Sequence, residues 1–205
     1  LTDGRFDITI GPLVDLWGFG AGSYSDQKVP DVDLLASTLI NVGWNNLVLD
    51  SQNRAIKKLR PISINLSAIA KGYGVDKVAD LLASKNIANY LVEIGGEVRA
   101  SGLNREDNPW RLGIEEPSLV QQSVQRVVAL TDQAIATSGD YRNYFEENGT
   151  RFSHTFDPTS GRPIKHNIAS VSVVADNAAA ADALATALNV LGEEAALKLL
   201  LFKLL

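Results

Sequence analysis

The chain has 205 residues, 45% hydrophobic and 21% charged, with a formal net charge of −5 at pH 7, a composition typical of a compact globular domain with a sizeable core. It contains no Cys and only two His, which excludes zinc fingers, iron–sulfur clusters, disulfides and Cys nucleophiles and leaves oxygen-ligated metals. The 19 Lys and Arg are scattered and outnumbered by 24 Asp and Glu, so we expect no nucleic-acid partner.

The chain shows no internal repeat and no Ser-, Pro- or Gly-rich linker, so we expect one domain over residues 1–205. No apolar run approaches the roughly 18 residues that span a bilayer. Hydrophobic periodicity and turn residues predict these elements in the first part of the chain: a strand at 6–10, a helix at 31–42, a hairpin from 47–49 and 55–58, a strand at 62–66 and a helix at 67–83.

The rest of the chain is predicted to contain mainly strands. The expected elements are a pair of strands around Gly95-Gly96 within 89–100, strands at 110–114, 124–130, 151–156 and 169–175, an Ala-rich helix at 177–191 and a core helix at 197–205. Because runs of hairpins are interrupted by only a few long helices, we expect an α+β fold with a largely antiparallel sheet and packed helices.

The segment GRFDITIGPLVDLWGFG, residues 4–20, combines a carboxylate with a Gly-Pro turn and an aromatic stretch. One interpretation is structural, with a strand, a turn and an aromatic plug in the core. The other is functional, with Asp7 and the backbone near it lining a groove for a planar ligand. The pattern alone favours the structural interpretation.

The segment ISINLSAIAKGYGVD, residues 62–76, leads through small residues to a helix start beside Lys71-Gly72. Small residues let a ligand approach the backbone, and the free N–H groups at a helix N-terminus attract phosphate. The Gly-x4-Gly-Lys-Ser/Thr spacing of a P-loop is absent. The alternative is an Ala/Gly-rich helix that simply packs against a sheet.

His154 precedes a tight turn, Asp157 to Gly161, which places it near the end of the preceding strand. A His at this position can act as a base near neutral pH, or it can cap the hairpin. A Ser-His-Asp triad is formally open, but the chain has no Gly-x-Ser-x-Gly elbow to carry the Ser.

Asp182 and Thr186 are four residues apart in the Ala-rich helix, so both oxygens project from one helix face. Two oxygen ligands are too few for Ca²⁺ but suit Mg²⁺, which retains waters and binds substrate phosphates. The alternative is that Asp182 interacts with the helix dipole and Thr186 bonds back to its own helix.

Four segments in chain order together resemble one family, the bacterial FAD:protein FMN transferases. They are FDITIGPLVDLWGFG, LSAIAKGYGVD, ATSGDYRNYF with SHTFDPTSGRPI, and SVSVVADNAAAADALATALNVLG, with VEIGGEVRASG and WRLGIEEP between them. The resemblance implies transfer of the FMN half of FAD onto a Thr or Ser hydroxyl of an acceptor flavoprotein. It further implies Mg²⁺ as the cofactor and AMP as the leaving group.

The resemblance also implies roles for individual residues. The positions that match the family's cofactor contacts are Arg5, Phe6, Asp7, Asn65, Lys71 and Phe156. The backbone carbonyl of Ala68 and the side chains of Asp182 and Thr186 match its metal ligands, and His154 matches the His that activates the acceptor hydroxyl.

Two positions depart from the family pattern. Asn65 stands where the family usually has Asp, which removes a charge that accepts hydrogen bonds from the cofactor. Ala185 stands where some members place a second metal-binding Asp. Two other functions stay open, an Mg²⁺-dependent FAD pyrophosphatase that produces FMN and AMP, and a non-catalytic FAD-binding module.

Family resemblance alone suggests a location. Members are exported and held by a lipid at the periplasmic face of the bacterial cytoplasmic membrane, and the lipid is attached outside the segment given by this sequence. Members also carry further sequence before and after the matched region, so we expect this chain to be incomplete at the N-terminus and at the C-terminus.

Overall fold

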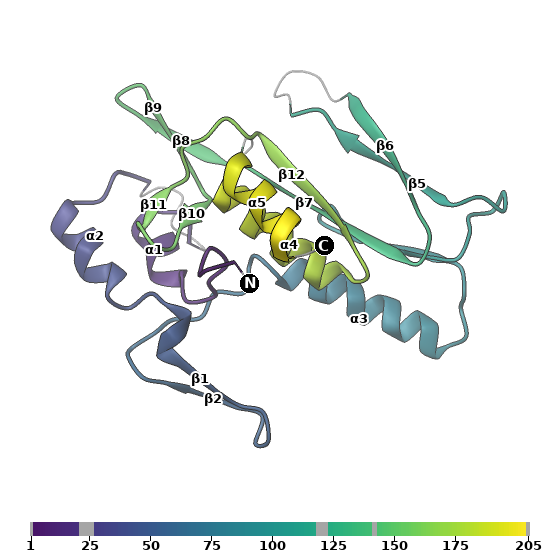
Figure 1. The fold of residues 1–205 in the computed structure, drawn as a ribbon, viewed down its shortest axis with the longest axis horizontal. Helices are drawn as coiled ribbons and strands as arrows, with labels where there is room; N and C mark the ends of the chain where they lie inside the picture. The colour runs from purple at the N-terminus through teal and green to yellow at the C-terminus, as the bar shows by residue number, and fades with distance from the viewer. Residues whose placement is uncertain (1, 21–26, 118–122, 141–142, 204–205) are drawn as a thin grey trace. The chain divides into compact units, whose positions relative to one another are not determined.

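A computed structural model describes residues 2–20, 27–117, 123–140 and 143–203 (Figure 1). The chain forms two compact units: unit 1 contains Leu1–Leu66, Asn143–Asn167 and Val190–Leu205, and unit 2 contains Ser67–Arg142 and Ile168–Asn189. The predicted α+β class with antiparallel pairing is confirmed. The domain expected from the sequence is made of two units whose segments alternate along the chain.

Unit 1 is built from short helices and two-stranded hairpins. Its elements are α1 (Gly11–Leu16), α2 (Val32–Leu39), the 3-10 helix η2 (Trp44–Asn46), the antiparallel pairs β1 (Leu47–Asp50) with β2 (Ala55–Lys58), β8 (Tyr144–Glu147) with β9 (Thr150–Ser153) and β10 (Phe156–Asp157) with β11 (Arg162–Pro163), and α5 (Glu193–Lys203). The core is aromatic. Trp17 packs against Phe152 and Phe156 with ring centroids 5.5 and 5.9 Å apart, and its Nε1 donates to the carbonyl of Gly161 at 3.0 Å.

Unit 2 contains a four-stranded antiparallel sheet in the order β12-β7-β4-β3. Its elements are α3 (Ala70–Ser84), β3 (Tyr90–Ile94), β4 (Glu97–Ser101), β5 (Trp110–Glu115) paired with β6 (Val124–Leu130), β7 (Gln133–Gly139), β12 (Ser170–Ala175) and α4 (Ala178–Leu191). The helix α3 packs on β3 and β4. Val75, Ala79 and Val92 form part of the buried cluster at that contact, so the amphipathic face of α3 faces the sheet.

The N-termini of α3 and α4 are each capped by a carboxylate from the other helix. Asp76 of α3 accepts the backbone N–H groups of Ala178 and Ala179, at 3.0 and 2.9 Å. In return, Asp182 of α4 accepts the N–H of Gly72, at 3.0 Å. Because the first N–H groups of a helix have no acceptor within the helix, each carboxylate supplies what the other helix lacks.

The predicted strand at 6–10 is wrong. Residues 3–9 form turns and bends, and Asp3 and Gly4, just before the expected strand, have positive φ angles of 50° and 82°. The carboxylate of Asp7 also accepts the N–H of Thr9, at 2.8 Å, which bends the chain locally. An alternating pattern therefore coincides here with an irregular segment.

The predicted strand at 62–66 is also wrong, and the helix after it starts later than expected. The N–H of Asn65 donates to the carbonyl of Ile8 at 2.7 Å, but no strand ladder follows among the described residues. Ile62 is buried whereas Ile64 is exposed, so the apolar alternation is not matched by a partner strand. The helix begins at Ala70 instead of residue 67.

Several other elements differ from their predictions. The Gly-Pro pair expected to form a turn opens α1, because Pro is well tolerated in the first turn of a helix. The strand expected at 151–156 is interrupted between β9 and β10, and β7 and β8 were not predicted. The helix α5 buries Leu199 but leaves Leu197 and Leu201 exposed, so the expected core helix is only partly buried.

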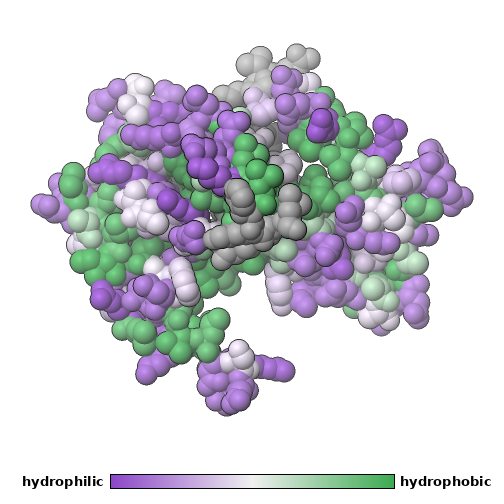
Figure 2. Space-filling model, in the orientation of Figure 1, coloured by the Kyte–Doolittle hydropathy of each residue, from purple (hydrophilic) through white to green (hydrophobic). Residues whose placement is uncertain are grey.

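The β1–β2 hairpin extends away from α1 and α2 (Figure 1). Figure 2 shows hydrophobic side chains near its base and hydrophilic ones at its tip. In the hairpin and the 3-10 helix before it, the exposed hydrophobic residues include Trp44, Val48, Leu49 and Ile56. Within the described residues, none of the helices combines the length and the apolar character required to cross a bilayer.

Candidate functional site

The N-terminus of α3 holds the first group of predicted site residues. The N–H of Gly72 donates to Oδ2 of Asp182 at 3.0 Å instead of to the carbonyl of Ala68 four residues earlier. A Cβ on Gly72 would lie 2.3 Å from the carbonyl oxygen of Ala178, so only glycine permits this close approach of α3 and α4. Helix packing therefore places the Asp182 carboxylate at a helix start.

Lys71 extends from the same helix start toward β4. Its Nζ lies 2.7 Å from Oε1 of Glu97 and 3.4 Å from the carbonyl oxygen of Gly95. The Glu97 side chain is only 2% exposed, whereas that of Lys71 is 45% exposed. The Lys71 ammonium is thus paired near the start of α3, while the Lys71 side chain as a whole stays partly exposed to solvent.

Burial raises the pKa of both carboxyl groups in this cluster, Glu97 and Asp182. At Glu97 this effect of burial on the pKa is opposed by the hydrogen bond and the charge of Lys71. At Asp182 the effect of burial on the pKa is opposed by the Gly72 N–H and the Lys71 charge. A positive group added beside Asp182 would favour its charged form.

The three residues predicted to bind a metal all belong to unit 2. Ala68 lies in the turn that precedes α3, Asp182 is buried and bonded to Gly72, and Thr186 is half-buried one turn further along α4. Within the described ranges, no three His, Asp or Glu residues gather closely enough to hold a metal ion. A metal here would therefore rely on one carboxylate, a hydroxyl and a backbone carbonyl.

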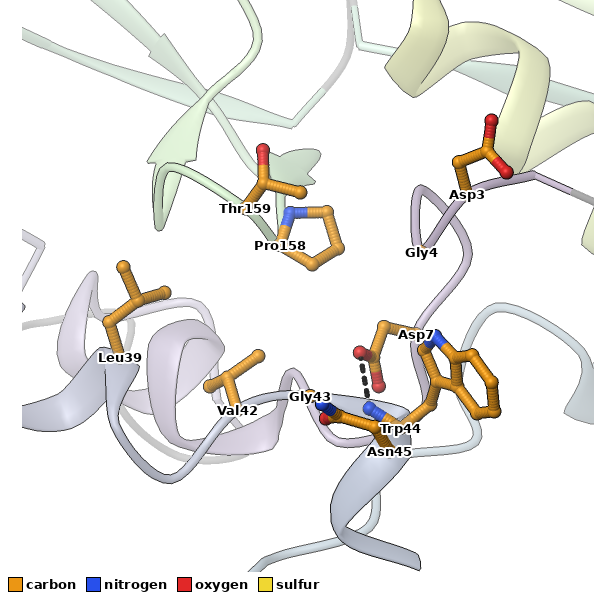
Figure 3. A pocket seen from close by; sticks show the side chains of 10 residues that line it. All are labelled: Asp3, Gly4, Asp7, Leu39, Val42, Gly43, Trp44, Asn45, Pro158 and Thr159. Carbon is orange, nitrogen blue, oxygen red and sulfur yellow. Dashed lines mark hydrogen bonds between the residues drawn. The ribbon is translucent and has the colours of Figure 1, made fainter.

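Unit 1 contains a pocket of about 350 Å³ beside the predicted flavin-contacting segment. Figure 3 shows Asp7 and Trp44 on one side of it, with Pro158 and Thr159 facing them. The apolar side chains of Leu39 and Val42 also line it. The pocket thus combines apolar surface with a few polar groups, as small-molecule sites commonly do.

Asp7 lines this pocket, but its oxygens already accept hydrogen bonds from the protein. Oδ1 accepts the N–H and the hydroxyl of Thr9, at 2.8 and 2.7 Å, and Oδ2 accepts the N–H of Trp44 at 2.9 Å. The Asp7 carboxylate therefore shapes the wall by tying η2 to the N-terminal segment, whichever ligand occupies the pocket.

Arg5 is held by the turn after β10. Its Nη1 lies 2.7 Å from Oδ2 of Asp157 and 3.2 Å from the hydroxyl of Thr159. Burial alone would raise the pKa of Asp157, but the hydrogen bonds from Thr159 and the guanidinium of Arg5 outweigh it and lower the pKa. The predicted tight turn is confirmed, with Gly161 N–H donating to the Asp157 carbonyl at 2.8 Å.

His154 follows directly after β9, as predicted from the turn beside it. Its Nδ1 lies 3.1 Å from the carbonyl oxygen of Asn143, and its ring centroid is 6.3 Å from that of Phe19. A carbonyl oxygen can only accept, so Nδ1 carries the proton in the neutral ring and Nε2 has the lone pair. That is the tautomer required of a base acting through Nε2.

The remaining predicted cofactor contacts differ in exposure. Phe6 is half-buried near the pocket segment, and its N–H donates to the hydroxyl of Thr2 at 3.3 Å. Asn65 is half-buried. Phe156 is only 3% exposed and packs in the aromatic core, so a ligand contact at Phe156 would come from its backbone.

Sequence reasoning assigned no role to Glu97 or Trp44. Glu97 had a usable signal, since it is a carboxylate directly after Gly95-Gly96 at the start of a strand that is otherwise largely buried. Trp44 lies in a short 3-10 helix, and no spacing rule connects that residue to Asp7, 37 positions earlier.

The chain is similar to curated proteins of one name. It is 52% identical over 194 residues to the FAD:protein FMN transferase of Vibrio cholerae, covering 95% of this chain and 58% of that protein. It is 42% identical over 198 residues to the FAD:protein FMN transferase of Escherichia coli K12, covering 95% of this chain and 56% of that protein. The chain therefore spans just over half the length of these relatives.

Solved structures agree with that result. The flavinyl transferase ApbE of Pseudomonas stutzeri in its apo form matches with a TM-score of 0.85 and 41% identity, over 97% of this chain and 61% of that one. The flavin transferase ApbE of Vibrio cholerae matches with a TM-score of 0.86 and 47% identity, over 97% and 62%. A model of the ApbE family matches residues 1–203, and the chain belongs to the ApbE family.

Proposed function

We propose that the protein containing this chain transfers the FMN moiety of FAD onto a Thr or Ser hydroxyl of an acceptor flavoprotein and releases AMP, with Mg²⁺ as cofactor. The observation that carries this proposal is the cluster at the start of α3, where the Lys71 ammonium and the Asp182 carboxylate lie at one helix N-terminus. A cation-binding carboxylate beside an anion-binding ammonium is suited to a metal-bound pyrophosphate. The names of the relatives support the same reaction.

The donor set at this cluster fits Mg²⁺. Asp182 uses Oδ2 for the Gly72 N–H, and no described residue donates to its Oδ1. Ala68 and Thr186 would supply a carbonyl and a hydroxyl oxygen, which are hard ligands. When bound, Mg²⁺ would neutralise charge that develops on the pyrophosphate oxygens.

The residues of unit 2 would bind and orient the pyrophosphate. The backbone N–H groups at the start of α3 and the Lys71 ammonium attract negative oxygens. Because phosphoryl transfer depends mainly on positioning and electrostatic stabilisation, a fixed ammonium is the contribution expected here.

His154 would act as the base for the acceptor. The acceptor oxygen forms a bond to the FMN phosphorus, the P–O bond to AMP breaks, and the hydroxyl proton moves to Nε2 of His154. The carbonyl of Asn143 beside Nδ1 holds the tautomer that this step needs and stabilises the ring once it is charged.

One incubation separates this function from two others. The protein encoded by the complete reading frame is incubated with FAD, Mg²⁺ and a flavoprotein that carries a Thr or Ser acceptor site. The products are identified by mass spectrometry. Flavin covalently attached to the acceptor, together with AMP, supports the proposal. Free FMN with AMP indicates a pyrophosphatase, and intact FAD indicates a binding module.

The ligand preference gives a second test. Donors at a helix start and a cation require the pyrophosphate, which FMN and riboflavin lack, so FAD should bind more tightly than either. A fluorescence titration with Mg²⁺ measures this preference, and equal affinity for FAD and riboflavin contradicts it.

The location is proposed from family resemblance alone. We infer that the protein is exported to the periplasmic face of the cytoplasmic membrane and anchored there by a lipid attached outside this segment. A signal sequence with a lipobox Cys in the complete reading frame supports this location, and a frame that lacks both contradicts it.

A further inference from the structure

Glu97 is an unusual residue for the position it occupies. Its side chain is 2% exposed, and Lys71 is the one described residue that bonds its carboxylate through a side chain. Oε2 is buried and accepts no hydrogen bond within the described part of the chain. Burying a carboxylate with one oxygen unsatisfied is costly, and an apolar residue of similar size would be tolerated at least as well. Stability alone therefore does not account for Glu97.

The surroundings of Lys71 show what Glu97 contributes. The Lys71 stem passes beside the β3–β4 turn, where a Cβ on Gly95 would lie 3.2 Å from its Cδ. Gly95 has a φ of +59°, which favours glycine, so the stem can pass close to the turn. At its end the ammonium is fixed on Glu97 Oε1 at 2.7 Å, although a Lys side chain otherwise keeps several rotatable bonds free.

The pairing of Lys71 with Glu97 also affects the Asp182 carboxylate. Asp182 accepts the N–H of Gly72, the residue next to Lys71, and Glu97 pairs with the Lys71 ammonium, so both carboxylates contact the start of α3. Lys71 bonds Glu97, and no ion pair joins Lys71 to Asp182 among the described residues. Asp182 therefore keeps Oδ1 for another cation.

We propose that Glu97 is a positioning residue, which holds the Lys71 ammonium at the start of α3 for the pyrophosphate of FAD and keeps it from neutralising Asp182. This inference rests on the proposed function. It assigns to Glu97 no contact with the substrate, and its effect on binding passes entirely through Lys71.

A double-mutant cycle tests this dependence in the complete protein. The variants are Glu97→Leu, Lys71→Met and the double substitution, and the affinities for FAD and for ADP are measured by calorimetry with Mg²⁺. ADP serves as a pyrophosphate probe without flavin. Glu97→Leu and Lys71→Met should each weaken both affinities about tenfold or more, as expected for a lost charged hydrogen bond. The double variant should bind no more weakly than Lys71→Met alone.

A stability measurement and a control complete the test. Replacing a buried charge by Leu should leave the unfolding midpoint of Glu97→Leu unchanged or higher. Glu97→Gln, which keeps an acceptor for Lys71, should bind better than Glu97→Leu. Glu93→Gln is the matched control, because Glu93 bonds the N–H of Gly96 in the same turn and should leave binding unchanged.

Two results would overturn the proposal. In the first, Glu97→Leu weakens FAD and ADP binding as much in the Lys71→Met background as in the wild type. In the second, Glu97→Leu lowers the unfolding midpoint while the folded variant binds FAD and ADP with unchanged affinity. If the wild type binds neither FAD nor ADP, the proposed function fails separately. The restraint is then tested without ligand, by acylation of Lys71 followed by peptide mass spectrometry. Faster labelling in Glu97→Leu supports the restraint, and equal labelling contradicts it.

Discussion

Asp182 and Gly72 are 110 residues apart in the sequence, yet the carboxylate of one lies 3.0 Å from the backbone nitrogen of the other. The same side chain thus satisfies a helix start with Oδ2, and under the proposed function its Oδ1 would bind the cation. A substitution at Asp182 changes packing and chemistry together unless the replacement keeps an oxygen for Gly72. This double role determines how the site has to be tested.

Asp182→Asn should separate these two roles. Asn keeps an acceptor for the Gly72 N–H but carries no charge, so the metal-free variant should unfold at or above the wild-type midpoint. Asp182→Ala loses the acceptor and should be less stable by about 1 kcal/mol. Both variants should lose the Mg²⁺ dependence of FAD affinity, and Thr186→Ala should lose part of it. Calorimetry with and without Mg²⁺ measures this, and a full Mg²⁺ effect in Asp182→Asn would exclude Asp182 as a ligand.

Gly72→Ala should destabilise the protein by about 1 to 3 kcal/mol. Its Cβ would meet the Ala178 backbone at 2.3 Å, so α3 and α4 would have to move apart. Gly74→Ala is the matched control in the same helix. Its Cβ would meet only the end of the Ile94 side chain, at 3.3 Å, and Ala favours a helix by roughly 1 kcal/mol over Gly. Urea unfolding should therefore show a lower free energy of unfolding than the wild type for Gly72→Ala and a higher one for Gly74→Ala. A Gly72→Ala variant as stable as the wild type would contradict the close packing.

His154→Ala should slow flavin transfer by about 100-fold or more while FAD affinity changes only a few-fold. A base acts on the proton of the acceptor and not on the bound cofactor. His166→Ala, which removes the other imidazole of the chain, is the control and should transfer flavin at a rate near that of the wild type. If His154→Ala instead melts earlier but keeps its rate per folded molecule, His154 is a structural residue of the hairpin.

Asp157→Asn should change how stability depends on pH. The folded pKa of Asp157 is lowered by Thr159 and Arg5, so its stabilising effect is complete above the unfolded pKa, near 4, and is lost as the pH falls through the folded value. At pH 7 the variant should be less stable by about 0.5 to 1 kcal/mol. In urea unfolding the difference should disappear in acid. Glu106→Gln, at an exposed carboxylate, should show no such trend.

The sequence was sufficient for elements whose pattern is local. The hairpin at 47–58 was predicted because Asp50 and Asn53 form a turn, and the structure shows Asp50 accepting both the N–H and the side-chain amide of Asn53. The start of α2 likewise follows from Asp31, whose carboxylate accepts the N–H groups of Asp33 and Leu34. Signals of this kind lie within three residues of the group that they satisfy.

Features that depend on distant segments were not predictable in this way. Residues 6–10 alternate like a strand, but the bonds of the Asp7 carboxylate to Thr9 and Trp44 bend the segment into turns. The role of Glu97 depends on Lys71, 26 positions earlier. Helical spacing paired Asp182 with Thr186 as metal ligands, but Ala68 was named from family resemblance alone, because its position in the chain gave no reason to connect it with Asp182.

The reciprocal capping of α3 and α4 by Asp182 and Asp76 also constrains when unit 2 can fold. The two contacts span 102 and 110 residues, and closing loops of that length costs entropy before any bond forms. During synthesis, the start of α3 stays incomplete until the ribosome has added the residues of α4. The two helix starts of unit 2 therefore cannot be completed before α4 has been synthesised.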